Sequence, residues 1–186
     1  LADEGAKVAI CARDGEAARK AADEVSPGGG RVLAFRADVA EVSDVREFVK
    51  NVVARWGQIH ILVNNAGAHG RTPMEGEDDK PWVEILHTNV LGTYYVTREA
   101  LRSMPTGGGG RIINVSSVLG RFGVPGYTAY CAAKHAVIGF TRALALEVAP
   151  RGITVNAICP GWVETEMSAR GMAQAAESLG ISAEAF

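Results

Sequence analysis

Short apolar runs alternate along this chain with longer segments that have the periodicity of amphipathic helices. Five runs are almost continuously apolar, as in strands covered on both faces, and they lie within residues 7–12, 31–39, 59–67, 111–117 and 153–161. Helical patterns occupy residues 15–25, 43–56, 80–104 and 128–148. This alternation predicts an α/β fold, in which helices form layers on both faces of a doubly wound parallel sheet.

The same pattern continues through the chain without a break in composition, so we expect a single domain over residues 1–186. Residues 1–4 resemble the last turn of a helix, ended by Gly5 in a left-handed conformation. Residues 166–186 are rich in Ala and Met, and we expect them to form a helical lid over a substrate.

The composition restricts the classes of partner. The 186 residues carry a formal net charge of -2, which gives no support for nucleic acid or an anionic membrane surface as the main partner. No apolar run approaches the ~20 residues that span a bilayer. The three cysteines, Cys11, Cys131 and Cys159, are odd in number and widely spaced, which favours reduced thiols over disulfides or metal ligands. We therefore expect a cytoplasmic protein with no metal site.

The segments that follow the five runs are the expected binding region, because ligands of such sheets bind outside the carboxyl ends of the parallel strands. These segments supply small residues, hydrogen-bonding groups and one basic residue. They are Ala12-Arg13, Asp38-Val39, Asn64–Gly67, Ser116-Ser117 and Pro160–Thr165.

Tyr130 and Lys134 lie four residues apart near the start of the helical pattern 128–148, so their side chains share one face. This spacing alone is also compatible with a buried helix whose lysine reaches out to solvent. An unperturbed phenol has a pKa near ~10. A nearby cation and the positive end of a helix would both favour the phenolate, which would ease proton transfer near neutrality.

Together with Asn89, these pieces give the chain a resemblance to the short-chain dehydrogenase/reductase family. The matching motifs are "DV", "NNAG", "TNV", "NVSS", "YCAAK" and "PGWVET", in the family's order and over almost the whole chain. The phrases "KHAVIGFTRALALE" and "RGITVNAICPGWVETEM" resemble 3-oxoacyl-(acyl carrier protein) reductases and polyketide ketoreductases most. The resemblance implies a Rossmann-like fold. It also implies a fragment truncated at both ends, because the family's glycine-rich phosphate loop and last strand are not found in this sequence.

The resemblance implies four catalytic residues. Tyr130 would donate a proton to a carbonyl oxygen as hydride arrives, and Lys134 would support Tyr130 and hold the nicotinamide ribose. Ser117 would bind the substrate oxygen, whereas its neighbour Ser116 would be structural. Asn89 would position the lysine through a water molecule.

It also implies a nicotinamide coenzyme, with NADP expected rather than NAD. Ala12 is not acidic, and Arg13 suits the 2′-phosphate of NADP; the alternative is an exposed arginine paired with Asp14. Asp38 would accept a bond from the adenine amino group, with a helix cap as its alternative. The expected coenzyme-binding residues are Arg13, Asp38, Val39, Asn65, Ala66, Gly67, Tyr130, Lys134, Pro160, Gly161, Val163 and Thr165, the last on the nicotinamide carboxamide.

The implied function is NADP(H)-dependent reduction of a 3-oxoacyl or polyketide-like thioester, as a small molecule or on an acyl carrier. A dehydrogenase of a small alcohol, sugar or steroid is the alternative within the family. A non-catalytic dinucleotide-binding regulator or an assembly module is the alternative outside catalysis. The resemblance further implies a homotetramer or dimer.

Overall fold

The fold is that of a computed structural model, which describes residues 1–27, 30–161 and 163. The strands are β1 (Val8–Ala12), β2 (Val32–Arg36), β3 (Ile61–Asn64), β4 (Arg111–Val115) and β5 (Thr154–Ile158). The α-helices are α1 (Gly15–Val25), α2 (Val42–Trp56), α3 (Lys80–Leu86), α4 (Gly92–Leu101) and α5 (Thr128–Val148). Each strand lies inside one of the predicted apolar runs, and α1 and α5 have the predicted bounds.

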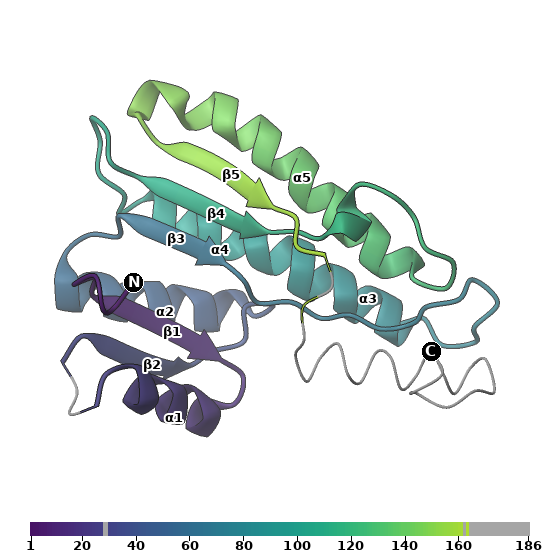
Figure 1. The fold of residues 1–186 in the computed structure, drawn as a ribbon, viewed down its shortest axis with the longest axis horizontal. Helices are drawn as coiled ribbons and strands as arrows, with labels where there is room; N and C mark the ends of the chain where they lie inside the picture. Colours follow the sequence, from purple (N-terminus) through teal and green to yellow (C-terminus); the bar gives the residue numbers. More distant parts are fainter. Residues whose placement is uncertain (28–29, 162, 164–186) are drawn as a thin grey trace.

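All strand pairs are parallel, which confirms the predicted fold class. In the described part of the chain the strands form two hydrogen-bonded groups, β1–β2 and β3–β4–β5, where the sequence predicted one sheet. Figure 1 shows the two groups beside each other with helices packed around them. Helices α2 and α4 join the groups, since Val45 and Val49 of α2 form a buried cluster with Val96 of α4, and Val39 and Leu62 pack against it.

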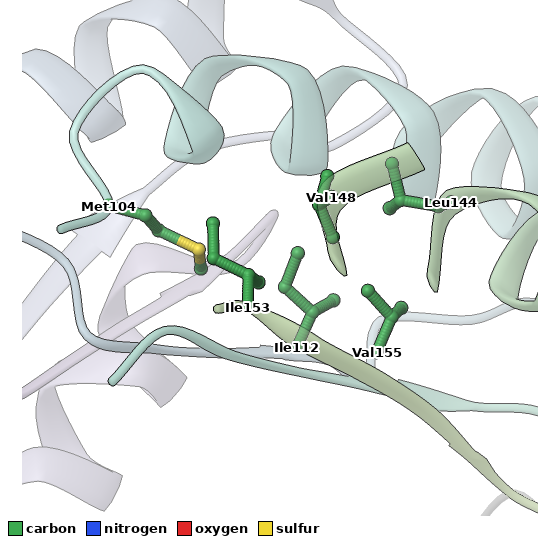
Figure 2. Packing of buried hydrophobic residues seen from close by; sticks show 6 residues of the cluster. All are labelled: Met104, Ile112, Leu144, Val148, Ile153 and Val155. Carbon is green, nitrogen blue, oxygen red and sulfur yellow. The ribbon is translucent and has the colours of Figure 1, made fainter. Parts of the chain in front are cut away.

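The largest core cluster lies between α5 and the strands β4 and β5. It consists of Met104, Ile112, Leu144, Val148, Ile153 and Val155, which are shown in Figure 2. Ile112 of β4 has no exposed surface, and Leu144 and Val148 come from one face of α5. Burying a side chain of this size contributes roughly 1.5–3 kcal/mol. The cluster therefore holds the carboxyl half of α5 firmly on the sheet.

The predicted helix over 80–104 is not one regular helix. Its middle, His87–Leu91, is a π-helical segment between α3 and α4. Gly92 follows this segment, and a Cβ at Gly92 would lie 2.8 Å from Val39 Cγ2, so the helix approaches the loop after β2 closely. Single π turns often occur at functional sites. This one contains Asn89.

Two helix starts differ in their capping. Asp14 caps α1, and its carboxylate accepts from the Glu16 and Ala17 amides at 2.9 and 3.0 Å. Helix α2 begins at Val42, one residue before the predicted start, and its cap residue Glu41 makes no side-chain capping bond. Among the described residues, no helix is long and apolar enough to cross a membrane.

Candidate active site

Ser117, Tyr130 and Lys134 lie together where β4 ends and α5 begins. The Lys134 ammonium donates to the carbonyl oxygen of Val115, the last residue of β4, at 2.8 Å. The same nitrogen lies 5.5 Å from the centre of the Tyr130 ring. Ser117 follows β4 and is hydrogen-bonded to Tyr130. The structure therefore brings these predicted site residues to one edge of the sheet.

Burial dominates the protonation of Tyr130 and Lys134. It raises the pKa of the Tyr130 phenol above its usual value, and the hydrogen bond with Ser117 opposes that rise. Burial also lowers the pKa of the Lys134 ammonium to about 8. The sequence predicted that the lysine would favour the phenolate, and this differs from the structure. The ammonium lies 5.5 Å from the ring centre, and burial outweighs the field it exerts on the phenol, so the net shift of the Tyr130 pKa is upward.

Asn89 is 1% exposed and presents its amide oxygen toward the same region. Its Nδ2 donates to the carbonyl oxygens of Ala68 and Ile85 at 2.7 and 2.8 Å. Its Oδ1 has no hydrogen-bond partner among the described residues. A Cβ on Gly67 would lie 2.9 Å from this oxygen and 3.7 Å from Lys134 Nζ. Gly67 therefore leaves the space around both groups open, because it has no side chain.

Ser116 and Ser117 have different surroundings, as predicted. The Ser116 hydroxyl is buried and donates to the carbonyl oxygen of Lys134 at 2.9 Å, so it joins β4 to α5. Gly120 makes this approach possible, since a Cβ there would lie 2.6 Å from Ser116 Oγ. The Ser117 hydroxyl faces Tyr130 and also accepts from the Leu119 amide at 3.2 Å.

Asn64 braces the strands below the site. Its Nδ2 donates to Asn114 Oδ1 and to Thr97 Oγ1, each at 2.8 Å. Asn114 in turn donates to Thr141 Oγ1 at 2.9 Å. This buried network links β3, β4, α4 and α5, the elements that carry the candidate catalytic residues.

Arg13 and Asp38 follow β1 and β2, where a coenzyme is expected. Arg13 is exposed and has no ion-pair partner within the described ranges; the neighbouring Asp14 carboxylate caps α1 instead. Asp38 Oδ1 accepts from the Ala40 amide at 2.9 Å, and it is not the cap of α2. The alternatives of an Asp14-paired arginine and a helix-capping Asp38 are therefore not what the structure shows.

The other predicted coenzyme residues lie in loops at strand ends. Val39 packs against Gly92, and Asn65 and Ala66 are exposed after β3. The Pro160 carbonyl accepts from the Val118 amide at 3.0 Å, which joins the loops after β5 and β4. Gly161 and Val163 are exposed beyond it. Thr165 and the predicted lid over 166–186 lie outside the described residues.

Two further side chains, His69 and Thr72, lie beside the candidate catalytic residues, and the sequence motifs assigned neither of them a catalytic or coenzyme-binding role. The His69 ring stands edge-on to the Tyr130 ring, with centroids 6.0 Å apart and an interplanar angle of 81°. Thr72 bonds to the first turn of α5. The available signal was their position just after the "NNAG" motif. No group of residues able to hold a metal occurs in the described part of the chain.

The chain is similar in sequence to one family model and to several reductases. The family model described as short chain dehydrogenase matches residues 1–176. A putative ketoacyl reductase of Streptomyces coelicolor is 42% identical over 171 residues, covering 91% of this chain and 66% of that protein. A 3-oxoacyl-(acyl-carrier-protein) reductase of Synechocystis is 37% identical over 169 residues, covering 90% of this chain and 68% of that protein.

A solved actinorhodin polyketide ketoreductase with NADPH aligns with a TM-score of 0.90 at 38% identity, covering 98% of this chain and 71% of that one. The solved sorbitol-6-phosphate 2-dehydrogenase of Erwinia amylovora aligns with a TM-score of 0.89 at 29% identity, covering 99% and 73%. The chain spans about two thirds or less of the length of the first curated relatives it matches.

Proposed function

This chain belongs to the short chain dehydrogenase family, and on that basis we propose that it reduces a carbonyl group to a hydroxyl with a nicotinamide coenzyme. The observation that carries the proposal is the partly buried phenol of Tyr130, which lies between Ser117 and Lys134 at the sheet edge. The phenol carries its proton at neutral pH, as a proton donor must before hydride arrives, because its ordinary pKa of ~10 is raised further by burial. The raised pKa by itself makes the phenol a weaker acid, so its position beside Ser117 and Lys134, and not the shift, supports the role.

In the proposed reaction the coenzyme supplies a hydride to the carbonyl carbon when it is bound. Tyr130 gives its phenolic proton to the carbonyl oxygen, so one O–H bond breaks and the new hydroxyl forms. The Ser117 hydroxyl donates a hydrogen bond to the same oxygen and stabilises the negative charge that develops on it. The Ser117 hydroxyl lies close enough to the phenol to lower its pKa, which supports a shared contact of the two hydroxyls with one substrate atom.

Lys134 and Asn89 supply the route by which the phenol regains its proton. A lysine with a pKa of about 8 can give up a proton near neutrality far more readily than an ordinary lysine. The Asn89 amide oxygen borders Gly67 on the same side as Lys134 Nζ, so it can accept a hydrogen bond from a donor that lies between them. We assign Asn89 the role of orienting this relay.

We propose NADP as the coenzyme. Arg13 follows β1 without an acidic neighbour at Ala12, and its guanidinium is free of carboxylates in the described part of the chain. The similar ketoreductase was solved with NADPH. The open space at Gly67 fits the close approach of a ligand to the backbone. The residues that would hold it are Arg13, Asp38, Val39, Asn65, Ala66, Gly67, Tyr130, Lys134, Pro160, Gly161, Val163 and Thr165.

The proposed substrate is a 3-oxoacyl or polyketide-like thioester, free or on an acyl carrier. The names of the similar ketoacyl and 3-oxoacyl reductases support this class. A sugar or small alcohol remains the second candidate, because the sorbitol-6-phosphate dehydrogenase has a closely similar fold. A non-catalytic regulator is less well supported, since Ser117, Tyr130 and Lys134 are all present and adjacent.

We further propose that the protein is cytoplasmic and forms a homodimer or homotetramer through its long helices. Leu146 of α5 is 80% exposed and Tyr94 of α4 is 41% exposed, which gives these helices apolar outer surfaces. Burial of such side chains between copies would stabilise an assembly.

The test is coenzyme oxidation by the full-length protein, screened over 3-oxoacyl thioesters, ketosteroids, simple ketones and keto sugars with NADPH and NADH. We expect the 3-oxoacyl thioesters to be reduced best, and with NADPH. Tyr130→Phe should lower kcat by ~10²–10⁴-fold, because it removes the hydroxyl that donates the proton and keeps the ring. Its Tm should stay near that of the wild type. An active Tyr130→Phe variant would exclude the proposed chemistry.

A further inference from the structure

Helix α5 starts without a capping side chain of its own. Its cap residue, Tyr127, makes no side-chain capping bond. The first bond along the helix runs from the Cys131 amide to the Tyr127 carbonyl at 2.9 Å. The amides of residues 128–130 precede this bond and so have no partner within the helix. Tyr130 lies in this first turn.

A residue distant in sequence supplies part of the missing cap. Thr72, in the loop after β3, is 7% exposed, and its hydroxyl oxygen accepts from the Ala129 amide at 3.1 Å. The Thr72 amide donates to the Gly126 carbonyl at 2.7 Å, and an isolated parallel bridge pairs Thr72 with Tyr127. The segment around Thr72 thus runs along the residues that lead into α5.

The hydrogen bonds of Thr128 determine the direction in which the Thr72 hydroxyl donates. Thr128 donates its proton to the Thr72 carbonyl oxygen at 2.7 Å. Its oxygen can therefore only accept, and it lies 3.3 Å from Thr72 Oγ1 and 3.3 Å from Trp82 Nε1. The Thr72 proton accordingly points to Thr128, which leaves the Thr72 oxygen free to accept from Ala129. Each hydroxyl in this group has a defined role.

We propose that Thr72 is a positioning residue for Tyr130, because it caps α5 from outside the helix. This proposal deepens the proposed function and rests on Tyr130 acting as the proton donor. The amide that Thr72 binds belongs to Ala129, directly before Tyr130 in the chain. Fixing that amide fixes the first turn, and with it the direction of the phenol toward Ser117. A helix end without a partner frays, and a displacement near 1 Å at a reacting group can cost ~10²-fold in rate.

A purely structural role predicts a different result. A buried threonine whose only effect is on folding would lower Tm when replaced, while the folded fraction would keep its kcat. A positioning role predicts a loss of kcat in protein that is fully folded. The chain offers a matched control at the other end of the same helix, where Val148 is 3% exposed and belongs to the core cluster.

The experiment compares Thr72→Val, Thr72→Ser, Val148→Ala and Tyr130→Phe in the full-length protein. Valine keeps the shape of threonine and removes the hydroxyl, so we expect kcat to fall by ~10-fold to ~100-fold with KM changed less than about threefold. Serine keeps the hydroxyl and should restore most of kcat. Val148→Ala should lower Tm and leave kcat unchanged.

The outcomes separate the two proposals. An active Tyr130→Phe enzyme would overturn the proposed function itself, whatever Thr72 does. An inactive Tyr130→Phe enzyme together with an unchanged kcat for folded Thr72→Val would overturn the role of Thr72 alone. If Thr72→Val does not fold, Thr72→Ala removes the same hydroxyl, and with it the bond to the Ala129 amide, without placing a methyl group where the hydroxyl was. An unchanged kcat there would equally reject the proposal.

Discussion

At the scale of single residues, Lys134 has two contacts that fix its position. Its ammonium donates to the Val115 carbonyl at 2.8 Å and faces the Tyr130 ring. Neither contact is with an anion, so burial lowers its pKa to about 8 without an opposing charge. The helical spacing of Tyr130 and Lys134 could be read from the sequence, and it predicted that their side chains share one face of α5. The pKa shifts of the two residues could not be predicted from the sequence, because they depend on how deeply the phenol and the ammonium are buried.

The lowered pKa of Lys134 has a consequence for stability. The folded pKa of about 8 lies below the ordinary value of 10.5, so between these pH values the unfolded chain binds the proton more tightly. The cost of burying the charge is complete below pH 8, and it is relieved as the pH rises toward 10.5. This group therefore makes the folded protein more stable with rising pH, by about 3 kcal/mol over the whole interval.

We expect the Tm of the wild type to rise relative to that of Lys134→Met between pH 7 and ~9.5, since methionine lacks the titrating group. Thermal unfolding of both proteins across this range is the measurement. The raised pKa of Tyr130 acts in the opposite direction only above pH 10. The raised pKa of Cys11 also acts in the opposite direction, from about pH 9 upward, but it does so in both proteins, so the difference in Tm isolates the lysine. A constant difference in Tm across the range would show that Lys134 does not titrate near pH 8.

At the scale of elements, sequence periodicity was most reliable where an element is regular. The bounds of α1 and α5 match because both helices have a clear pattern and a clear stop. The π segment within 80–104 was missed, because one wide turn does not change the apolar periodicity enough to be visible. Thr72 was missed for another reason. Its contacts with Thr128 and Ala129 join a loop to the start of α5 across 56 and 57 residues of sequence, which no local pattern reports.

The buried amide network is the element-scale feature with the largest expected effect on stability. Asn114 of β4 has no exposed surface and joins Asn64 to Thr141. We expect Asn114→Ala to lower the free energy of unfolding by about 2–3 kcal/mol, since it leaves Asn64 Nδ2 short of an acceptor in a buried position. Urea denaturation is the measurement.

Thr141→Val is the matched control for this prediction. It keeps the volume of the side chain and leaves one donor, Asn114 Nδ2, without its acceptor, whereas Asn114→Ala breaks two bonds of the network and also opens a cavity. The loss for Thr141→Val should therefore be smaller, about 1–2 kcal/mol. Equal losses for both variants would mean that the link between Asn64 and Asn114 adds no more to stability than the peripheral bond does.

At the scale of the whole molecule, the strands divide into two groups that share helices instead of backbone hydrogen bonds. Apolar runs predicted parallel strands, but their order and pairing depend on which edges meet in space. The three core clusters contain residues of β3, β4 and β5 and none of β1 or β2. The contact between Phe35 of β2 and Phe48 of α2, with ring centroids 5.3 Å apart, links the smaller group to the rest.

This difference in burial predicts unequal opening of the two groups in the 186-residue chain. β4 lies between two strands, and Ile112 and Asn114 have no exposed surface, whereas every residue of β1 is only partly buried. We expect amides within 8–12 to exchange hydrogen faster than amides within 111–115, because local opening needs less free energy where fewer apolar contacts break. Mass spectrometry of peptides covering both segments measures this difference in exchange rate.

The variant Asn114→Ala tests whether the two groups open separately. It should speed hydrogen exchange in β3, β4 and β5 and leave exchange in β1 and β2 unchanged. If the variant accelerated both groups equally, the two would open as one cooperative unit, and the helices would couple them as tightly as a continuous sheet does.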